Sequence, residues 1–243
     1  MIIHYHTFKN AGTSVDEMLK RNFAEHWEEA EFRLPGAGKH SNVDVVTQYL
    51  RERPNLQAFS SHTALLPLPN LGRPIFPIVF VRHPLDRLRS AYTFERRQVA
   101  DTHGARLAKA QDFSGYLREL LASPHNRQAR NFQTSRLACN EPAANGPELD
   151  RAMRAFDALP FVGLVEAYDA SLQRLQQKLA PLFPAFKAVV VHKNRTAAAP
   201  EPLARKLEAM AKAIGAELYG EVRAANADDI ALFERARALY AAA

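Results

Sequence analysis

The chain begins Met1-Ile-Ile-His-Tyr-His-Thr-Phe-Lys9-Asn-Ala-Gly-Thr-Ser14-Val15, and this stretch decides the fold. Ile2–His6 is a short apolar run, continuous rather than alternating, which is typical of a strand buried on both faces of a parallel sheet. From Val15 onward, apolar residues recur at three- and four-residue spacing, which predicts a helix. A strand that passes through a short loop into a helix is the repeating unit of α/β proteins, so we expect an α/β fold.

Four further apolar runs follow, separated by segments with helical spacing. The predicted strands are Leu56–Ser60, Phe76–Val81, Phe161–Val165 and Ala188–Val191. Residues from about 200 to 243 are predicted to form two helices. The alternation predicts a central, mostly parallel five-stranded sheet with helices on both faces and C-terminal helices. No segment looks like a linker, so we expect residues 1–243 to form a single domain. Within it, residues 101–147 are expected to be an excursion of helices and loops over one end of the sheet.

Composition excludes several classes of protein. The 243 residues are 47% hydrophobic and 24% charged, unlike a disordered chain, a coiled coil or a collagen-like fibre. The net charge of +6 favours anionic partners, but no block of like charges selects one kind. Cys139 is the only cysteine, so no intrachain disulfide can form. The start does not resemble a signal peptide, and no apolar run approaches the roughly 20 residues that span a bilayer. We therefore expect a cytoplasmic protein without a transmembrane segment.

The loop Lys9-Asn-Ala-Gly-Thr-Ser14 lies between the first predicted strand and helix. Backbone N–H groups at a helix N-terminus are unpaired, and the helix dipole favours an anion there. Lys9 adds a positive charge, and Gly12 allows the backbone to approach a ligand closely. The loop is not a Walker A motif, because the lysine precedes the glycine. The residues alone leave open a plain helix start, in which Ser14 and Glu17 form a capping box.

A second candidate segment begins at Arg82, where the third predicted strand ends. Pro84 suits the first position of a helix, so a helix is predicted to start there. Arg82 offers a planar fork for phosphate oxygens, and Ser90, two turns into the helix, offers a hydroxyl donor. The two side chains could therefore hold one phosphate from two sides. The alternative is a solvated basic helix start in which the two residues are unrelated.

Together, the two segments resemble sulfotransferases that use 3′-phosphoadenosine-5′-phosphosulfate (PAPS). Lys9–Ser14 is similar to the 5′-phosphosulfate loop of that family, and Phe80–Tyr92 is similar to its 3′-phosphate motif. Their order and separation most resemble the small bacterial and Golgi-type carbohydrate sulfotransferases. Phe8-Lys9 replaces the usual Pro-Lys, and Asn10 replaces the usual Thr, but the lysine and Gly-Thr-Ser remain. Weaker likenesses occur in residues 131–137, 162–172 and 229–236.

The resemblance implies a P-loop-like domain that moves a sulfuryl group from PAPS to an acceptor hydroxyl by metal-independent in-line displacement, leaving 3′-phosphoadenosine-5′-phosphate (PAP). It implies that Lys9 stabilises the charge on the leaving 5′-phosphate oxygen. The cofactor-binding residues that it implies are Lys9, Asn10, Ala11, Gly12, Thr13, Ser14, Arg82, Ser90, Lys193 and Arg195. The acceptor class that it favours is a carbohydrate, with no nucleic acid as partner. Peripheral membrane association and the oligomeric state are left open. The sequence shows no cluster of metal ligands, so no metal is expected.

The acceptor must lose a proton, and a histidine suits this role because its pKa lies near neutrality. His62 follows the second predicted strand. Lys9, His62 and Arg82 each follow a different strand, so we expect them to converge at the carboxyl edge of the sheet. Relatives in the carbohydrate branch often have His or Glu at this place. Glu166, after the fourth predicted strand, is the reserve candidate for the base. A surface or helix-capping histidine is the alternative.

Two other functions remain open on the sequence. A P-loop kinase of a small metabolite shares the strand–loop–helix start, but it should carry a Walker A lysine and an acidic magnesium ligand. A non-catalytic polyanion-binding protein should carry clustered basic residues interleaved with exposed aromatics. Arg127, Arg130 and Arg136 lie in the excursion. The sequence does not decide whether they bind acidic sugars or face water.

Overall fold

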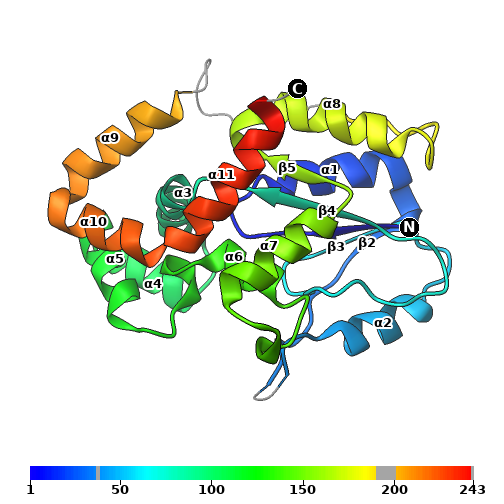
Figure 1. Ribbon diagram of the computed structural model, residues 1–243, viewed down its shortest axis with the longest axis horizontal. Helices are drawn as coiled ribbons and strands as arrows, with labels where there is room; N and C mark the ends of the chain where they lie inside the picture. The colour runs from blue at the N-terminus through cyan, green and yellow to red at the C-terminus, as the bar shows by residue number, and fades with distance from the viewer. Residues whose placement is uncertain (37–38, 190–200, 242–243) are drawn as a thin grey trace.

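The computed structural model describes residues 1–36, 39–189 and 201–241. In this part of the chain, one five-stranded sheet has the strand order β2-β3-β1-β4-β5 (Figure 1). The strands are β1 (Ile2–Tyr5), β2 (Trp27–Glu29), β3 (Ala58–Ser61), β4 (Phe76–Val81) and β5 (Val162–Leu164). Every pairing between neighbours is parallel. The predicted α/β class is therefore confirmed.

The fifth predicted strand is not observed in the part of it that the structure describes. Ala188 and Val189 lie outside any strand, and the rest of Ala188–Val191 lies outside the described residues. The remaining member of the sheet is β2, which was not predicted. Its three residues, Trp27–Glu29, are partly or fully exposed at the sheet edge. Two of them are glutamates, so neither an apolar run nor an alternation marks the strand.

Helices cover both faces of the sheet, as predicted. One face carries α1 (Gly12–Phe23) and α8 (Tyr168–Leu179). The other face carries α2 (Val43–Arg51), α6 (Phe132–Ala138), α7 (Glu148–Ala158) and α11 (Ala227–Ala241). Successive strand side chains point to opposite faces, so Ile2 belongs to the first core and Ile3 to the second.

A third group of helices has a core of its own. It consists of α3 (Pro84–Arg97), α4 (His103–Ala110), α5 (Phe113–Ala122), α9 (Leu203–Ile214) and α10 (Ala216–Ala225). Figure 1 shows this group beyond the carboxyl ends of the strands. Residues 101–147 thus form helices and loops, as predicted, although α6 packs on a sheet face. Short 3-10 turns occupy Ala24–His26, Arg127–Ala129, Ala143–Asn145 and Val165–Ala167.

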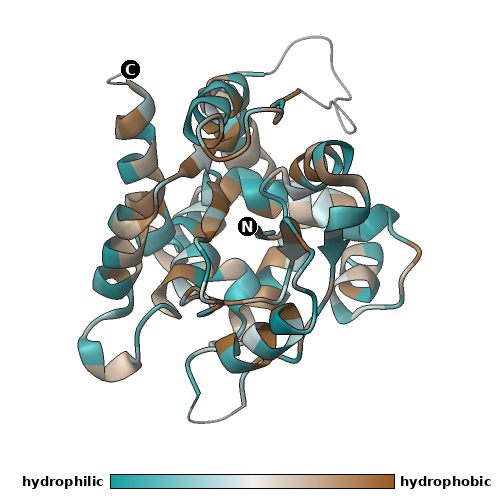
Figure 2. Ribbon diagram, turned by 90° about the vertical axis from the view of Figure 1, so that its right-hand side faces the viewer, coloured by the Kyte–Doolittle hydropathy of each residue, from teal (hydrophilic) through white to brown (hydrophobic). Residues whose placement is uncertain are grey.

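The C-terminal region contains three helices rather than the two that were predicted. Gly215, with φ of 82°, separates α9 from α10, and Asn226 separates α10 from α11. The helices around the sheet carry both hydrophilic and hydrophobic residues, as amphipathic helices with one buried face do (Figure 2). None of the helices in the described part of the chain combines the length and the apolar character that crossing a bilayer requires.

Candidate functional site

The loop between β1 and α1 has an unusual backbone. Lys9 and Ala11 have φ of 65° and 63°, in the left-handed region that non-glycine residues rarely adopt. Each such residue costs on the order of 1–3 kcal/mol, so the surrounding structure must hold it there. Helix α1 starts at Gly12, and Ala11 caps it without a side-chain hydrogen bond. Ser14 therefore lies inside the first turn, and the capping-box interpretation was wrong. The Ser14 N–H donates to the Ala11 carbonyl at 3.0 Å, so the N–H groups of Gly12 and Thr13 are the ones left for water or a ligand.

The Asn10 side chain holds this loop in place. It is buried, and its Nδ2 donates to the Phe80 carbonyl and to Gln133 Oε1, both at 2.7 Å. Gln133 Oε1 also accepts from the Arg82 backbone N–H at 2.8 Å, and its Nε2 donates to the Arg82 carbonyl at 2.8 Å. The Asn10 amide is thus committed to the protein rather than offered to a cofactor. Gln133 joins the loop to the end of β4, a role that the sequence did not reveal.

Helix α11 supports Gln133 from the far end of the chain. Asp229 accepts hydrogen bonds from the backbone N–H groups of Gln133 at 3.1 Å and Thr134 at 2.7 Å. In return, Asn131 Oδ1 accepts from the N–H groups of Asp228 at 3.1 Å and Asp229 at 3.3 Å. Two segments that were only weak family likenesses in the sequence, residues 131–137 and 229–236, therefore meet. Together they fix the start of α6.

Lys9 and Arg82 are brought together, as predicted. Arg82 Nη1 donates to the Lys9 carbonyl at 3.0 Å, while its Nε and Nη2 donate to Asp86 Oδ2 at 2.9 and 2.7 Å. Lys9 Nζ lies 4.4 Å from the centre of the Phe94 ring. Within the described residues, no carboxylate lies within ion-pair distance of Lys9. Burial, and then the charge of Arg82, lower the pKa of Lys9. A bound anion would relieve the repulsion between the two cations.

Helix α3 begins at Pro84, as predicted, with the half-buried Ser90 two turns into it. The helix start is not solvated, which contradicts that part of the alternative, but among the described residues no contact joins Arg82 to Ser90. Arg87 is fully buried and donates to the Gln128 carbonyl, and Asp86 is buried as well. Arg82 and Ser90 thus belong to a packed helix start at the carboxyl edge of the sheet.

His62 follows β3 and is held by a carboxylate. Its Nδ1 lies 2.8 Å from Glu31 Oε1, and its backbone N–H donates to the same oxygen at 2.9 Å. Burial raises the pKa of Glu31, but hydrogen bonds from Thr63 and His62 outweigh this effect and lower it. With Nδ1–H directed at Glu31, Nε2 is left to accept a proton. Glu31 was missed because it follows β2, the strand that the sequence did not reveal.

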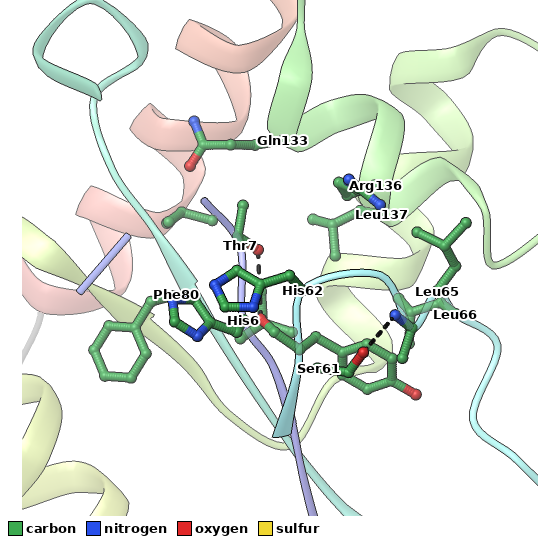
Figure 3. A pocket seen from close by; sticks show the side chains of 14 residues that line it. His6, Thr7, Ser61, His62, Leu65, Leu66, Phe80, Gln133, Arg136 and Leu137 are labelled. Atoms are coloured by element: carbon green, nitrogen blue, oxygen red, sulfur yellow. Dashed lines mark hydrogen bonds between the residues drawn. The ribbon is translucent and has the colours of Figure 1, made fainter. Parts of the chain in front are cut away.

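His6 connects His62 to the loop. The two imidazole rings stack with centres 3.7 Å apart and planes at 29° (Figure 3). His6 Nδ1 lies 2.7 Å from Asp16 Oδ2 in α1. A Cβ placed on Gly12 would lie 1.9 Å from His6 Cδ2. The close approach that requires a glycine here is therefore the packing of His6, whereas the sequence had assigned Gly12 to the ligand.

The structure gathers two groups of possible metal ligands, although the sequence showed no such cluster. They are His4, His6 and Asp16, and His6, Glu29 and His62; within each group the ligand atoms lie within 4.8 Å of one another. The residues come from β1, α1 and the ends of β2 and β3, which only the sheet order makes neighbours. His4 Nδ1–H already donates to the Asp16 carboxylate, with Nδ1 2.6 Å from Oδ1.

A pocket lies at the carboxyl ends of β1, β3 and β4 (Figure 3). Apolar side chains form most of its wall, and its polar side chains include His6, Thr7, His62, Gln133 and Arg136. Lys9, Arg82, Ser90 and Glu166 do not line this pocket. Glu166 instead accepts a hydrogen bond from the His83 backbone N–H at 2.8 Å. Of the two candidate bases, His62 lines the pocket and Glu166 does not.

Lys193 and Arg195, which were predicted to bind the cofactor, lie outside the described residues. Tyr168 packs against Phe80 in the core between the sheet and α8, with ring centres 5.6 Å apart.

The fold and the site define an α/β protein with one parallel sheet, whose carboxyl edge carries a strained basic loop, a histidine pair and a pocket. No protein-family model matches the chain. The chain is 35% identical over 247 residues to a protein of Archaeoglobus fulgidus that is described as uncharacterized. The alignment covers 99% of this chain and 97% of the archaeal protein. The chain belongs to the same family as this archaeal protein.

Proposed function

We propose that the protein is a PAPS-dependent sulfotransferase that acts on a hydroxyl group, with a carbohydrate as the acceptor. The observation that carries the proposal is the pairing of Lys9 and Arg82 at the loop before α1. Two neighbouring cations beside the N–H groups of Gly12 and Thr13 suit the phosphosulfate of the donor, because helix N-termini and cationic side chains both bind such anions. The strained backbone at Lys9 and Ala11 is consistent with a loop shaped for a ligand.

Lys9, the loop before α1 and Arg82 each have a separate role in an in-line displacement. The acceptor oxygen attacks sulfur, and the bond from sulfur to the 5′-phosphate oxygen breaks, with its electron pair passing to that oxygen. Lys9 stabilises this developing charge. The N–H groups of Gly12 and Thr13 and the Ser14 hydroxyl hold the 5′ end of the donor. Arg82 uses three of its five N–H donors on Asp86 and Lys9, so two remain for the 3′-phosphate beside Ser90.

His62 Nε2 takes the proton from the acceptor hydroxyl. Glu31 binds Nδ1 and stabilises the imidazolium that forms. The pocket beside His62, of about 30 Å³, has room only for the reacting hydroxyl of the acceptor, and its apolar wall from β4 and α6 limits the access of water.

Calorimetric titration with PAP, and separately with ATP and magnesium, tests the proposal first. We expect tight binding of PAP without metal, and little binding of ATP. A preference for ATP with magnesium would favour a kinase, and binding of neither nucleotide would favour a polyanion-binding protein.

Substitution of Arg82 tests the 3′-phosphate assignment. Arg82→Ala should weaken PAP by at least about tenfold, the loss expected for one charge-assisted hydrogen bond, and adenosine 5′-phosphate far less. Arg89→Ala removes an exposed charge from the adjoining helix α3 and should change neither affinity. Equal losses for both nucleotides with Arg82→Ala would contradict the assignment.

Two further substitutions separate binding from chemistry. Lys9→Ala should remove most turnover while PAP binding remains measurable. His62→Ala should lower turnover by about 100-fold or more, the usual contribution of a general base. Near-normal turnover of His62→Ala at every pH would rule out His62 as the base.

A further inference from the structure

A second hollow adjoins the pocket that holds His62. It is a groove of about 670 Å³ between α6, the start of α7 and the loop before α2, and it shares Leu65 and Arg136 with the pocket. Its basic lining residues are Lys39, His40, Arg127, Arg136 and Arg151. The groove is therefore continuous with the place where the acceptor hydroxyl would react.

Two arginines of this groove are already paired. Arg127 makes two hydrogen bonds with the Glu148 carboxylate, both at 2.9 Å. Arg151 donates to the carbonyls of Gly146 at 3.0 Å, Ala138 at 2.7 Å and Glu141 at 2.9 Å. Each guanidinium is held by partners within the protein, which fixes its place in the wall of the groove.

Arg136 differs from both. Among residues 1–36, 39–189 and 201–241, its guanidinium has no hydrogen-bond partner and no carboxylate within 4 Å. Its guanidinium packs 5.3 Å from the centre of the Phe132 ring. The side chain is half-buried, and burial lowers the pKa of Arg136, an effect that the nearby Cys139 and Glu31 offset only in part. The Glu31 carboxylate is itself bound to His62 and Thr63, so a ligand anion that pairs directly with the guanidinium would further offset the cost of burying this cation.

Its position indicates where that anion would lie. Arg136 comes from α6, as does Gln133, and lies at the junction of pocket and groove, in the same pocket as the stacked His6 and His62 rings (Figure 3). An anion held there would be part of the acceptor, near its reacting hydroxyl. A guanidinium fork matches the planar oxygens of a carboxylate and the oxygens of a sulfate ester.

We propose that the acceptor is an acidic saccharide, and that Arg136 binds a carboxylate or sulfate group next to the hydroxyl that is modified. This inference rests on the proposed function and names its substrate class. Lys39 and His40, further along the groove, extend the positive lining for a longer chain.

An array of uronate-containing, sulfate-bearing and neutral oligosaccharides tests this proposal with the PAP-loaded protein. We expect retention of acidic members only. Calorimetry then compares the best binder with its carboxyl-reduced or desulfated derivative, which shows whether the carboxylate or the sulfate is recognised. The derivative should bind at least about tenfold more weakly, the loss of one charge-assisted interaction.

Three variants assign the effect to Arg136. Arg136→Gln should lower the affinity for the acidic saccharide at least about tenfold and leave PAP affinity unchanged, and Arg136→Lys should fall between it and the wild type. Arg154→Gln is the matched control, because it removes an equal charge from an exposed pair with Glu141 outside the groove. Retention of neutral members, retention of no acidic member, or full affinity in Arg136→Gln would each overturn the inference. Failure of PAP itself to bind would instead overturn the sulfotransferase proposal.

Discussion

Replacing Gly12 by alanine would place a methyl group inside the imidazole of His6. The new Cβ would lie 1.9 Å from His6 Cδ2 and 2.0 Å from Nε2. The first distance falls about 1.5 Å short of the 3.4 Å at which ordinary contact begins. The ring cannot move away freely, because it is buried, stacked on His62 at 3.7 Å and held 2.7 Å from Asp16.

Because the His6 ring is confined, the loss of stability in Gly12→Ala can be estimated. Forcing an extra methyl group into a packed site costs about 1–3 kcal/mol. If the His6 ring moves away from the methyl group, it also loses its contacts with Asp16 and His62. We therefore expect Gly12→Ala to lower the free energy of unfolding by about 2 kcal/mol. For a chain of this size, that corresponds to a fall in Tm of roughly 4–8 °C.

Urea unfolding measures the effect, with Gly220→Ala as the matched control. Gly220 lies inside α10 with nothing within 4 Å of the added Cβ, so alanine should stabilise the protein there by about 0.5–1 kcal/mol. His6→Ala removes the obstructing ring, so the double variant with Gly12→Ala should be about 1–2 kcal/mol more stable than additivity predicts. Equal effects at the two glycines, or an additive double variant, would refute the packing argument.

Three other predictions concern the site and its surroundings. Glu31→Gln should lower turnover roughly tenfold, because a charge-assisted bond of about 1.5 kcal/mol no longer holds the His62 tautomer; Glu25→Gln, an exposed control, should not. Burial lowers the pKa of His83 from 6.5 to about 4. As the pH falls, this histidine is therefore protonated in the unfolded state before it is protonated in the folded state. Unfolding free energy should therefore fall by up to about 3 kcal/mol from pH 6.5 to pH 4, and the decline should be shallower in His83→Gln. Turnover should survive a chelator; loss of activity that a divalent cation restores would assign a metal role to the histidine and carboxylate cluster.

The sequence by itself determined the α/β class and the places where chain direction changes. Continuous apolar runs such as Phe76–Val81 can be buried on both faces, and Pro84 after Arg82 marks a helix start wherever the chain folds. Those signals depend only on residues close in the sequence, so they can be recognised without knowing which segments pack together. Local signals did not reveal β2, and they predicted a strand that is not observed at Ala188 and Val189. A three-residue edge strand is stabilised by its pairing with β3, and a short apolar run alone does not specify pairing.

The candidate site, too, could be predicted from the sequence only in part. Lys9, His62 and Arg82 could be proposed from the sequence because each follows a recognisable strand. Their partners could not, since Glu31 reaches His62 only when β2 pairs beside β3. Gln133 likewise reaches the loop only when Asp229 of α11 fixes the start of α6. Whether an arginine is paired or free, as Arg127 and Arg136 are here, depends on which carboxylates packing brings within about 3–4 Å. Distances between residues remote in the chain are set by tertiary packing alone.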